Sequence, residues 1–240
     1  MKHRITGVIL AGGASKRMGR NKAQLPLGDR RMIEWVAGAL DCLFDEVLIV
    51  THHPQSFPML DNVRIVQDLV NSGNRSSLVG LYTGLYHARN DLIFAVPCDM
   101  PLLNRAVIEH MIELLDGEDV RVPLIGSHFQ PLHAFYQKSC LPHMRRYIDR
   151  ENYKVIRFYE DVLVRTVDEK VLRQFDPELN CFVNVNGSNE YEMVQEIWKE
   201  RAQQWCHEWM KKPPVRRREM TDDNRRSIGD SQRSRQNTHF

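Results

Sequence analysis

Two kinds of apolar pattern alternate along the chain. Short, nearly continuous apolar runs are typical of strands buried on both faces of a sheet. Such runs occupy residues 8–11, 46–50, 62–66, 92–96, 120–125 and 132–136. Residues 162–167 predict a further strand through alternating apolar positions. Segments with apolar residues every three or four positions predict amphipathic helices. These segments occupy residues 31–40, 78–87, 105–115, 139–149 and 190–209.

The first two predicted strands enclose a helix and so form a strand–helix–strand unit. Such a unit implies parallel pairing of its strands with a right-handed crossover. We therefore expect an α/β fold, with a three-layer, Rossmann-like arrangement in which helices cover both faces of a mostly parallel sheet.

The first predicted strand ends in a glycine pair that a basic loop follows. Gly12 and Gly13 allow backbone N–H groups to curl around an anion, because neither residue carries a Cβ atom. Four cations follow within nine residues, namely Lys16, Arg17, Arg20 and Lys22. This chemistry predicts a phosphate site, and the simpler alternative is a plain turn with solvated basic side chains.

Two common phosphate-binding loops do not fit this stretch. A Walker A loop requires Gly-Lys followed by Ser or Thr after its spacer, whereas residues 19–22 read GRNK. A dinucleotide-binding fingerprint requires three glycines in the G-x-G-x-x-G spacing, which the loop lacks. The loop therefore fits neither of these two classes, and the predicted phosphate site and the plain turn both stay open at this point.

Two acidic residues follow predicted strands. Ligands bind at the carboxyl ends of the strands in an open parallel sheet, so Asp68 is placed on the same rim as the glycines. Asp99 lies between Pro97 and Pro101, which stiffen the backbone. An acid held there suits Mg²⁺, which favours one or two carboxylates with substrate phosphates. The alternatives are a turn residue at Asp68 and a helix cap at Asp99, although Asn104 already fills the second role.

Histidines give weaker signals. His133 and Gln130 are candidate pocket residues, but a hydrogen-bonded histidine within the sheet explains His133 equally well. His52 and His53 are neighbours whose side chains should point apart, so no metal site is expected there.

The composition is that of a soluble globular protein, long enough for one sizeable domain and a tail. No apolar stretch approaches the roughly 20 residues of a membrane span, and no cleavable signal pattern precedes the first strand, so a cytoplasmic location is expected. The five cysteines are scattered without a C-x-x-C pair. This favours reduced thiols over disulfides or structural zinc.

The charge is distributed unevenly. Residues 211–240 hold nine Lys/Arg and four Asp/Glu, a net of +5, which leaves −3 for residues 1–210 because the whole chain carries +2. We expect a folded domain at 1–210 and a basic, disordered tail at 211–240. A nucleic-acid role would rest on the tail alone.

Four stretches together resemble the molybdenum cofactor guanylyltransferases, a branch of the nucleotidyltransferases that share the GT-A-like fold. They are LAGGASKRMGRNK at 10–22, IVQD ending at Asp68, VPCDMPL around Asp99 and FVNVN at 182–186. The first and third are typical of the superfamily, and the order and spacing of all four indicate this branch. The resemblance covers residues 5–198 and implies the GT-A-like nucleotidyltransferase fold for them.

The resemblance also implies site residues. Those implied to bind GTP are Leu10, Ala11, Gly12, Gly13, Lys22, Asp68 and Asp99. Asp99 would hold Mg²⁺, the only cofactor expected, while Asn184 and Asn186 would contact molybdopterin. Catalytic roles fall to Lys22, Arg17 and Asp99, because transfer of a nucleotide to an ionised phosphate depends mainly on positioning and charge neutralisation.

The chain departs from the family in two places. Relatives carry a Gly-Pro-Leu-Ala-Gly loop where residues 75–80 read RSSLVG, although Ser76 or Ser77 is a suitable helix cap there. Relatives have Asn-Thr-Pro-Glu after FVNVN, where residues 186–190 read NGSNE. The first change alters the loop beside the substrate phosphates, and the second affects only the capping of the last helix.

The predicted function is transfer of GMP from GTP to the phosphate of molybdopterin, which releases pyrophosphate. GTP and molybdenum-loaded molybdopterin are the expected substrates. Transient contacts with proteins that deliver or receive the cofactor are also expected, whereas membrane or nucleic-acid binding is not. The alternatives are a related nucleotidyltransferase using CTP or a sugar phosphate, and a non-catalytic nucleotide-binding protein.

Overall fold

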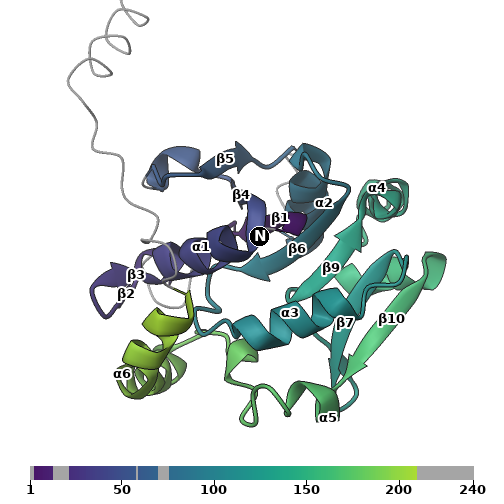
Figure 1. Cartoon of the computed structure of the whole chain (residues 1–240). Helices are drawn as coiled ribbons and strands as arrows, with labels where there is room; N and C mark the ends of the chain where they lie inside the picture. The colour runs from purple at the N-terminus through teal and green to yellow at the C-terminus, as the bar shows by residue number, and fades with distance from the viewer. Residues whose placement is uncertain (1–2, 13–21, 58, 70–75, 210–240) are drawn as a thin grey trace, which may run out of the picture.

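An eight-stranded sheet organises the part of the chain that the computed structural model describes, residues 3–12, 22–57, 59–69 and 76–209 (Figure 1). The strand order is β10-β7-β9-β6-β1-β4-β5, and β8 pairs with β7. The strands are β1 (His3–Leu10), β4 (Phe44–Thr51), β5 (Val63–Gln67), β6 (Leu92–Pro97), β7 (Val120–Ile125), β8 (His128–Phe129), β9 (Ala134–Gln137) and β10 (Val164–Asp168). Only β8 and β9 run antiparallel to the strands they pair with. The predicted mostly parallel sheet is confirmed.

Helices cover both faces of the sheet and complete the three predicted layers (Figure 1). The α-helices of the described residues are α1 (Met32–Leu43), α2 (Ser77–His87), α3 (Arg105–Glu113), α4 (Leu141–Asp149), α5 (Glu169–Leu172) and α6 (Ser188–Trp209). One apolar core gathers α1, α3, α5 and α6, and the other gathers α2 and α4. Adjacent residues of β1 serve both cores, because Ile9 belongs to the first and Val8 to the second.

Shorter elements connect these layers. The 3₁₀ helices are η1 (Lys22–Gln24), η2 (Pro54–Ser56), η3 (Lys138–Cys140), η4 (Val155–Asp161) and η5 (Asn180–Phe182). A small hairpin of β2 (Pro26–Leu27) and β3 (Arg30–Arg31) precedes α1. The periodicity did not indicate this hairpin, β8 or α5, because each is too short to show a period.

Helix starts follow local capping chemistry. The Asn104 side chain accepts a hydrogen bond from the Val107 N–H at 3.1 Å, and the Ser76 hydroxyl accepts one from the Val79 N–H at 3.2 Å. Both predicted caps are confirmed. The predicted helix 139–149 is divided into η3 and α4, since Pro142 lacks an N–H group and suits the first turn of a helix.

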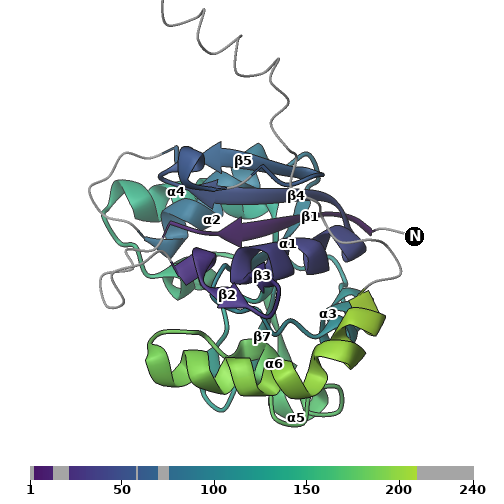
Figure 2. The same cartoon turned by 90° about the vertical axis from the view of Figure 1, so that its left-hand side faces the viewer.

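The last helix packs against the first. The rings of Trp35 on α1 and Trp198 on α6 lie 4.3 Å apart between centroids, and Figure 2 shows α6 on the side of the molecule that carries β2 and β3. Gly28, in the turn between β2 and β3, has φ +61° and lies against the Trp198 indole, where a Cβ atom would come within 2.7 Å. Glycine at this turn therefore permits the close packing of α6.

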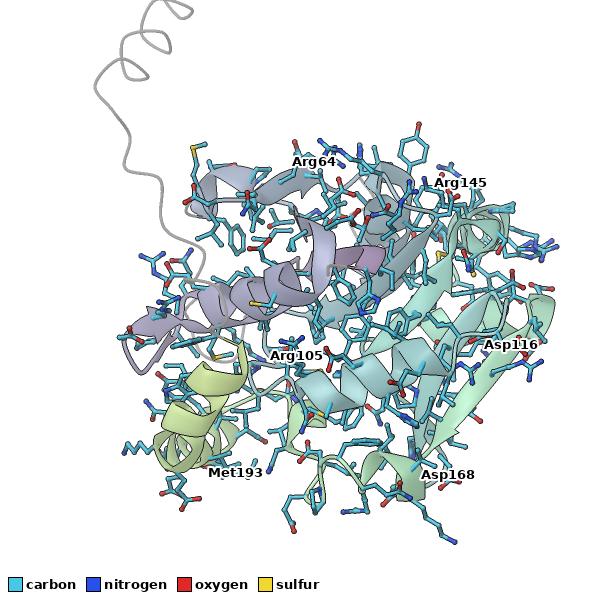
Figure 3. The ribbon with its side chains drawn as sticks, in the orientation of Figure 1. Arg64, Arg105, Asp116, Arg145, Asp168 and Met193 are labelled. Atoms are coloured by element: carbon cyan, nitrogen blue, oxygen red, sulfur yellow. The ribbon has the colours of Figure 1, made fainter. Side chains whose placement is uncertain are left out.

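Charged side chains lie at the periphery of these layers. Arg145, Asp116 and Asp168 lie at the outer edges in Figure 3. In the described part of the chain, no helix combines the length and apolar character needed to cross a membrane. The predicted tail, 211–240, lies outside the described residues, so the proposed boundary at 210 remains a prediction.

Candidate functional site

A pocket of about 310 Å³ opens at the carboxyl ends of β1, β4, β5 and β6. Its lining is formed by Leu10, Ala11, Gly12, Lys22, Val50, His52, Asp68, Ser76, Ser77, Gly80, Pro97, Cys98, Asp99, Leu132, Asn184 and Asn186. The structure therefore gathers almost every described residue that the sequence predicted for the site. Gly13 and Arg17 lie outside the described residues, so their roles remain predictions.

The end of β1 is fixed between its two neighbouring strands. The Ala11 N–H donates to the Val50 carbonyl of β4 at 2.8 Å, and the Cys98 N–H donates to the Leu10 carbonyl at 3.1 Å. A Cβ atom on Gly12 would lie 3.4 Å from both Asp68 Oδ2 and His52 Cδ2. Because Gly12 has no side chain, a ligand can approach the backbone closely at this point of the pocket.

Lys22 joins two parts of the chain that are distant in sequence. Its Nζ lies 3.8 Å from Asp99 Oδ2 and donates a hydrogen bond to Asn186 Oδ1 at 3.3 Å. The Val185 N–H donates to the Asp99 carbonyl at 2.9 Å, which ties the FVNVN segment to the end of β6. The predicted phosphate, metal and acceptor residues therefore meet in one place.

Asp99 lies in a site where its charge is only partly offset. Burial raises the pKa of this carboxyl above its ordinary value, and the Lys22 ammonium counteracts the rise. The Asp99 side chain is 20% exposed, so one face of it remains accessible to a ligand. Among the described residues no group of three or more His, Cys, Asp or Glu could enclose a metal ion. A single accessible carboxylate such as Asp99 would suit a divalent cation of the kind that takes one or two protein carboxylates.

Asp68 pairs with a histidine that the sequence analysis did not select. His52 Nε2 lies 3.2 Å from Asp68 Oδ2, and the Asp68 side chain is 5% exposed. Burial raises the Asp68 pKa, and His52 opposes that rise. His52 follows β4 as Asp68 follows β5, so the same strand-end argument applied to it would have placed it on the rim.

The prediction that His133 and Gln130 line the pocket is wrong, because neither residue is part of its lining. The His133 ring is fully buried between the rings of Phe94 and Phe182, 5.1 and 4.6 Å away between centroids. Neither of its ring nitrogens has a hydrogen-bond partner among the described residues, so the alternative of a hydrogen-bonded histidine is also wrong. Burial lowers the pKa of His133 to about 3, which keeps the ring neutral.

Cys98 lines the pocket without reactive character. Burial, reinforced by the neighbouring Asp99 charge, raises the pKa of its thiol to about 12. The thiol therefore stays protonated at neutral pH and is a poor nucleophile. None of the pocket side chains described is arranged as an activated nucleophile, whereas Lys22 and Asp99 suit phosphate and metal chemistry.

Sequence comparison relates most of the chain to one family. Residues 7–164 match the family model described as MobA-like NTP transferase domain. The chain is 35% identical over 198 residues to a probable molybdenum cofactor guanylyltransferase of Natranaerobius thermophilus, covering 81% of this chain and 97% of that protein. It is 40% identical over 181 residues to a protein of the same description from Pelotomaculum thermopropionicum, covering 75% and 87% of the two chains.

Solved structures share the fold. The molybdopterin-guanine dinucleotide biosynthesis protein A of Archaeoglobus fulgidus has a TM-score of 0.69 and 23% identity, covering 82% of this chain and all of that one. A Mycobacterium tuberculosis protein solved in complex with manganese has a TM-score of 0.55 and 20% identity, covering 82% of this chain. Together with the strand order, these similarities confirm the predicted nucleotidyltransferase fold.

Proposed function

Because the chain belongs to the MobA-like NTP transferase family, we propose that it transfers GMP from GTP to the phosphate of molybdopterin in the molybdenum cofactor. The products are the molybdopterin guanine dinucleotide form of the cofactor and pyrophosphate. The observation that carries this proposal is the convergence of Lys22, Asp99 and Asn186 in one pocket at the end of β1. The names of the similar guanylyltransferases support the choice of substrates.

The acceptor phosphate is already ionised, so the pocket needs no strong general base. An acceptor oxygen forms a bond to the α-phosphorus of GTP, and the bond from that phosphorus to the pyrophosphate oxygen breaks. Lys22, whose Nζ lies 3.8 Å from Asp99 Oδ2, is proposed to neutralise the charge that moves onto pyrophosphate. Arg17 is proposed for the same task from its place in the loop.

Asp99 is proposed to hold Mg²⁺, which when bound would neutralise phosphate oxygens and orient them for in-line transfer. The manganese complex of the Mycobacterium tuberculosis protein supports the binding of a divalent ion by a protein of this fold. Asp99 carries the only carboxylate in the pocket lining that lies beside Lys22, which supports its assignment among the described residues.

The two substrates are proposed to occupy adjacent parts of the pocket. Leu10, Ala11, Gly12 and Asp68 are assigned to GTP, with Gly13 added from the sequence. Asn184 and Asn186 are assigned to molybdopterin. Since the Asn186 side chain already accepts a hydrogen bond from Lys22, this asparagine would connect the acceptor site with the phosphate site.

The cellular setting follows from the proposed substrates. GTP and molybdenum-loaded molybdopterin are intracellular compounds, so the proposal includes a cytoplasmic location. It also includes transient contacts with proteins that deliver molybdopterin or receive the finished cofactor.

The test is Mg²⁺-dependent release of pyrophosphate from GTP, CTP, ATP and UTP in parallel, with and without molybdenum-loaded molybdopterin. Asp99→Asn should lower the rate with GTP by about 100-fold or more, because the isosteric amide lacks the charge that holds the metal. Asp91→Asn is the matched control, since Asp91 precedes the other end of β6 and its side chain is 88% exposed.

Each outcome has a distinct meaning. Release that requires GTP, molybdopterin and Asp99 together would support both the reaction and the acceptor. Release with CTP in place of GTP would indicate a cytidylyltransferase, and release with a sugar phosphate as acceptor would indicate another nucleotidyltransferase. Binding of GTP without release of pyrophosphate under any condition would contradict the proposed enzymatic activity and favour a non-catalytic nucleotide-binding protein.

A further inference from the structure

The His52 and Asp68 side chains form a pair at the pocket rim. Asp68 is already assigned to GTP, whereas His52 has no role in the proposed reaction. His52 Nε2 and Asp68 Oδ2 are 3.2 Å apart, and both residues line the pocket with Gly12 beside them. The pair follows β4 and β5, whereas Asp99 follows β6 on the other side of β1. The strand order therefore places the end of β1 between the pair and Asp99.

A nucleotide that lies across the strand ends could reach both groups. Neighbouring strands lie about 4.8 Å apart, so the ends of β6 and β5, three strand spacings apart, lie roughly 14 Å from each other, and the Asp68 carboxylate reaches back from β5 to the side of Gly12 at the end of β1. If the phosphates of GTP lie at Lys22 and Asp99, a nucleoside that extends across the end of β1 and Gly12 reaches Asp68 and His52. The base end of the nucleotide is then the part that this pair meets.

Asp68 has one carboxylate oxygen that faces the pocket without a close partner. The carboxylate interacts with the Thr83 hydroxyl as well as with His52. Its side chain is 5% exposed, and its Oδ1 is buried without a partner at hydrogen-bond distance among the described residues. Gly80 of α2, another pocket residue, lies beside this oxygen, where a Cβ atom would come to 3.9 Å. A buried acceptor without a partner is destabilising, so a ligand that brings an N–H donor to Asp68 Oδ1 would relieve this cost.

The hydrogen-bond donors on each base indicate which nucleotide Asp68 would favour. Guanine presents two adjacent donors on one edge, the N1–H and the 2-amino group. Adenine and cytosine present one amino group beside an unprotonated ring nitrogen, which a carboxylate repels. An ionised Asp68 held in a fixed orientation would therefore favour guanine over both.

We propose that His52 is a positioning residue for base selection: it donates a hydrogen bond from Nε2 to Asp68 Oδ2 and so directs Oδ1 toward the donor edge of guanine. This inference rests on the proposed function, because it takes GTP as the nucleotide. His52 itself touches Asp68 and not the reacting phosphorus, so its effect falls on nucleotide preference rather than on the chemical step.

The test compares nucleotide binding and turnover in matched variants of the full-length protein. The variants are His52→Leu, His52→Gln, Asp68→Asn, the double variant His52→Leu/Asp68→Asn and the control His53→Gln. Affinities for GTP, ITP, ATP and 2′-deoxy-GTP are measured by calorimetry, and kcat and KM by pyrophosphate release. ITP lacks the 2-amino group and 2′-deoxy-GTP lacks a ribose hydroxyl, so the two separate base contacts from sugar contacts. Thermal unfolding confirms that each variant folds.

His52→Leu should reduce the preference for GTP over ATP by about tenfold or more, the loss expected when a hydrogen bond to a charged group is removed. The change should appear in KM for GTP, with kcat affected less. His52→Gln should restore most of the preference because its amide can donate to Asp68, and His53→Gln should match wild type. The double variant should be no less selective than Asp68→Asn alone, since the histidine acts through the carboxylate.

Three results would overturn the inference. The first is a preference for GTP over ATP that is unchanged in His52→Leu. The second is a double variant in which the losses of GTP preference from the two single changes add up fully. The third is a His52→Leu variant that loses only its preference for GTP over 2′-deoxy-GTP. A wild-type protein that binds GTP selectively but gives one of these results would leave the proposed function intact. A wild-type protein that does not bind GTP would overturn the proposed function and the inference together.

Discussion

Lys22 shows how one side chain can combine several parts of the site. It reaches Asp99 and Asn186, which stand 77 and 164 positions later in the chain, and its side chain is 16% exposed. A lysine at a rim contributes little to the apolar core, so its removal should affect chemistry far more than folding.

Lys22→Ala is expected to lower kcat by about 100- to 1000-fold, the usual loss on removing a group that stabilises transition-state charge. The midpoint of thermal unfolding should stay close to that of wild type. Steady-state pyrophosphate release and calorimetry measure the two quantities. Lys138→Ala, a lysine paired with Asp91 away from the pocket, is the control. Equal rates for Lys22→Ala and wild type would refute the assignment of the loop.

His133 links a single residue to the pH dependence of stability. Its pKa is about 3 in the folded protein and about 6.5 in an unfolded chain, so the unfolded state binds a proton that the folded state does not. The stabilisation from the neutral ring is complete above pH 6.5. It is lost progressively as the pH falls from 6.5 toward 3.

The free energy of unfolding should therefore fall by up to about 1.4 kcal/mol per pH unit in this range on account of His133. His133→Leu has no titrating group at this position and should show a correspondingly smaller slope. Urea unfolding at pH 7, 5 and 4 measures the effect. If the free energy of unfolding falls with pH at the same rate in the variant and in wild type, His133 does not cause the acid sensitivity.

At the scale of elements, helix α2 packs closely on strand β1. A Cβ atom on Gly84 of α2 would come within 2.4 Å of Val8 Cγ1, so the helix approaches the sheet only because the residue is glycine. The same helix carries Gly80 and begins beside Ser76 and Ser77, all of which line the pocket. The position of α2 thus determines one wall of the site.

Gly84→Ala should destabilise the protein by about 1–3 kcal/mol, because the added methyl group must displace the helix or Val8. It should also weaken nucleotide binding through the shift of Gly80. Gly38→Ala is a matched control, since Gly38 lies within α1 and a Cβ atom there would meet nothing within 4 Å. That change should stabilise the protein by about 0.5–1 kcal/mol. Denaturant unfolding measures both, and equal effects would contradict the packing argument.

At the scale of the whole molecule, the net charge is distributed unevenly along the chain. The described residues end with α6 (Ser188–Trp209), and residues 211–240 carry a net charge of +5 whereas residues 1–210 carry −3. The domain boundary at residue 210 is a prediction that truncation can test. A chain ending at residue 210 is therefore expected to have the thermal midpoint and turnover of the full-length protein.

Any nucleic-acid binding should disappear with residues 211–240, because the remaining residues 1–210 carry a net charge of −3. Enzyme assays, thermal unfolding and DNA-binding titrations at two salt concentrations compare the two chains. A truncated protein with lost turnover would show that the tail takes part in the reaction, and retained DNA binding would contradict the charge argument.

Local sequence determined the elements that depend on near neighbours. Periodicity placed the buried strands and the longer helices, and the Asn104 and Ser76 caps follow from side chains that bond to N–H groups three residues away. The strand-end rule also placed Asp68 and Asp99 on one rim, because the rim depends only on strand direction.

Tertiary structure alone decided which distant residues meet. The antiparallel insertion of β9, the burial of His133 between two aromatic rings, the His52–Asp68 pair and the Lys22–Asn186 bond all depend on the order of strands in the sheet. Short-range patterns carry no information on that order, since it results from the packing of both cores together. The sequence by itself therefore determined the fold class and the chemistry at the end of β1, and the folded chain determined the partners that complete the site.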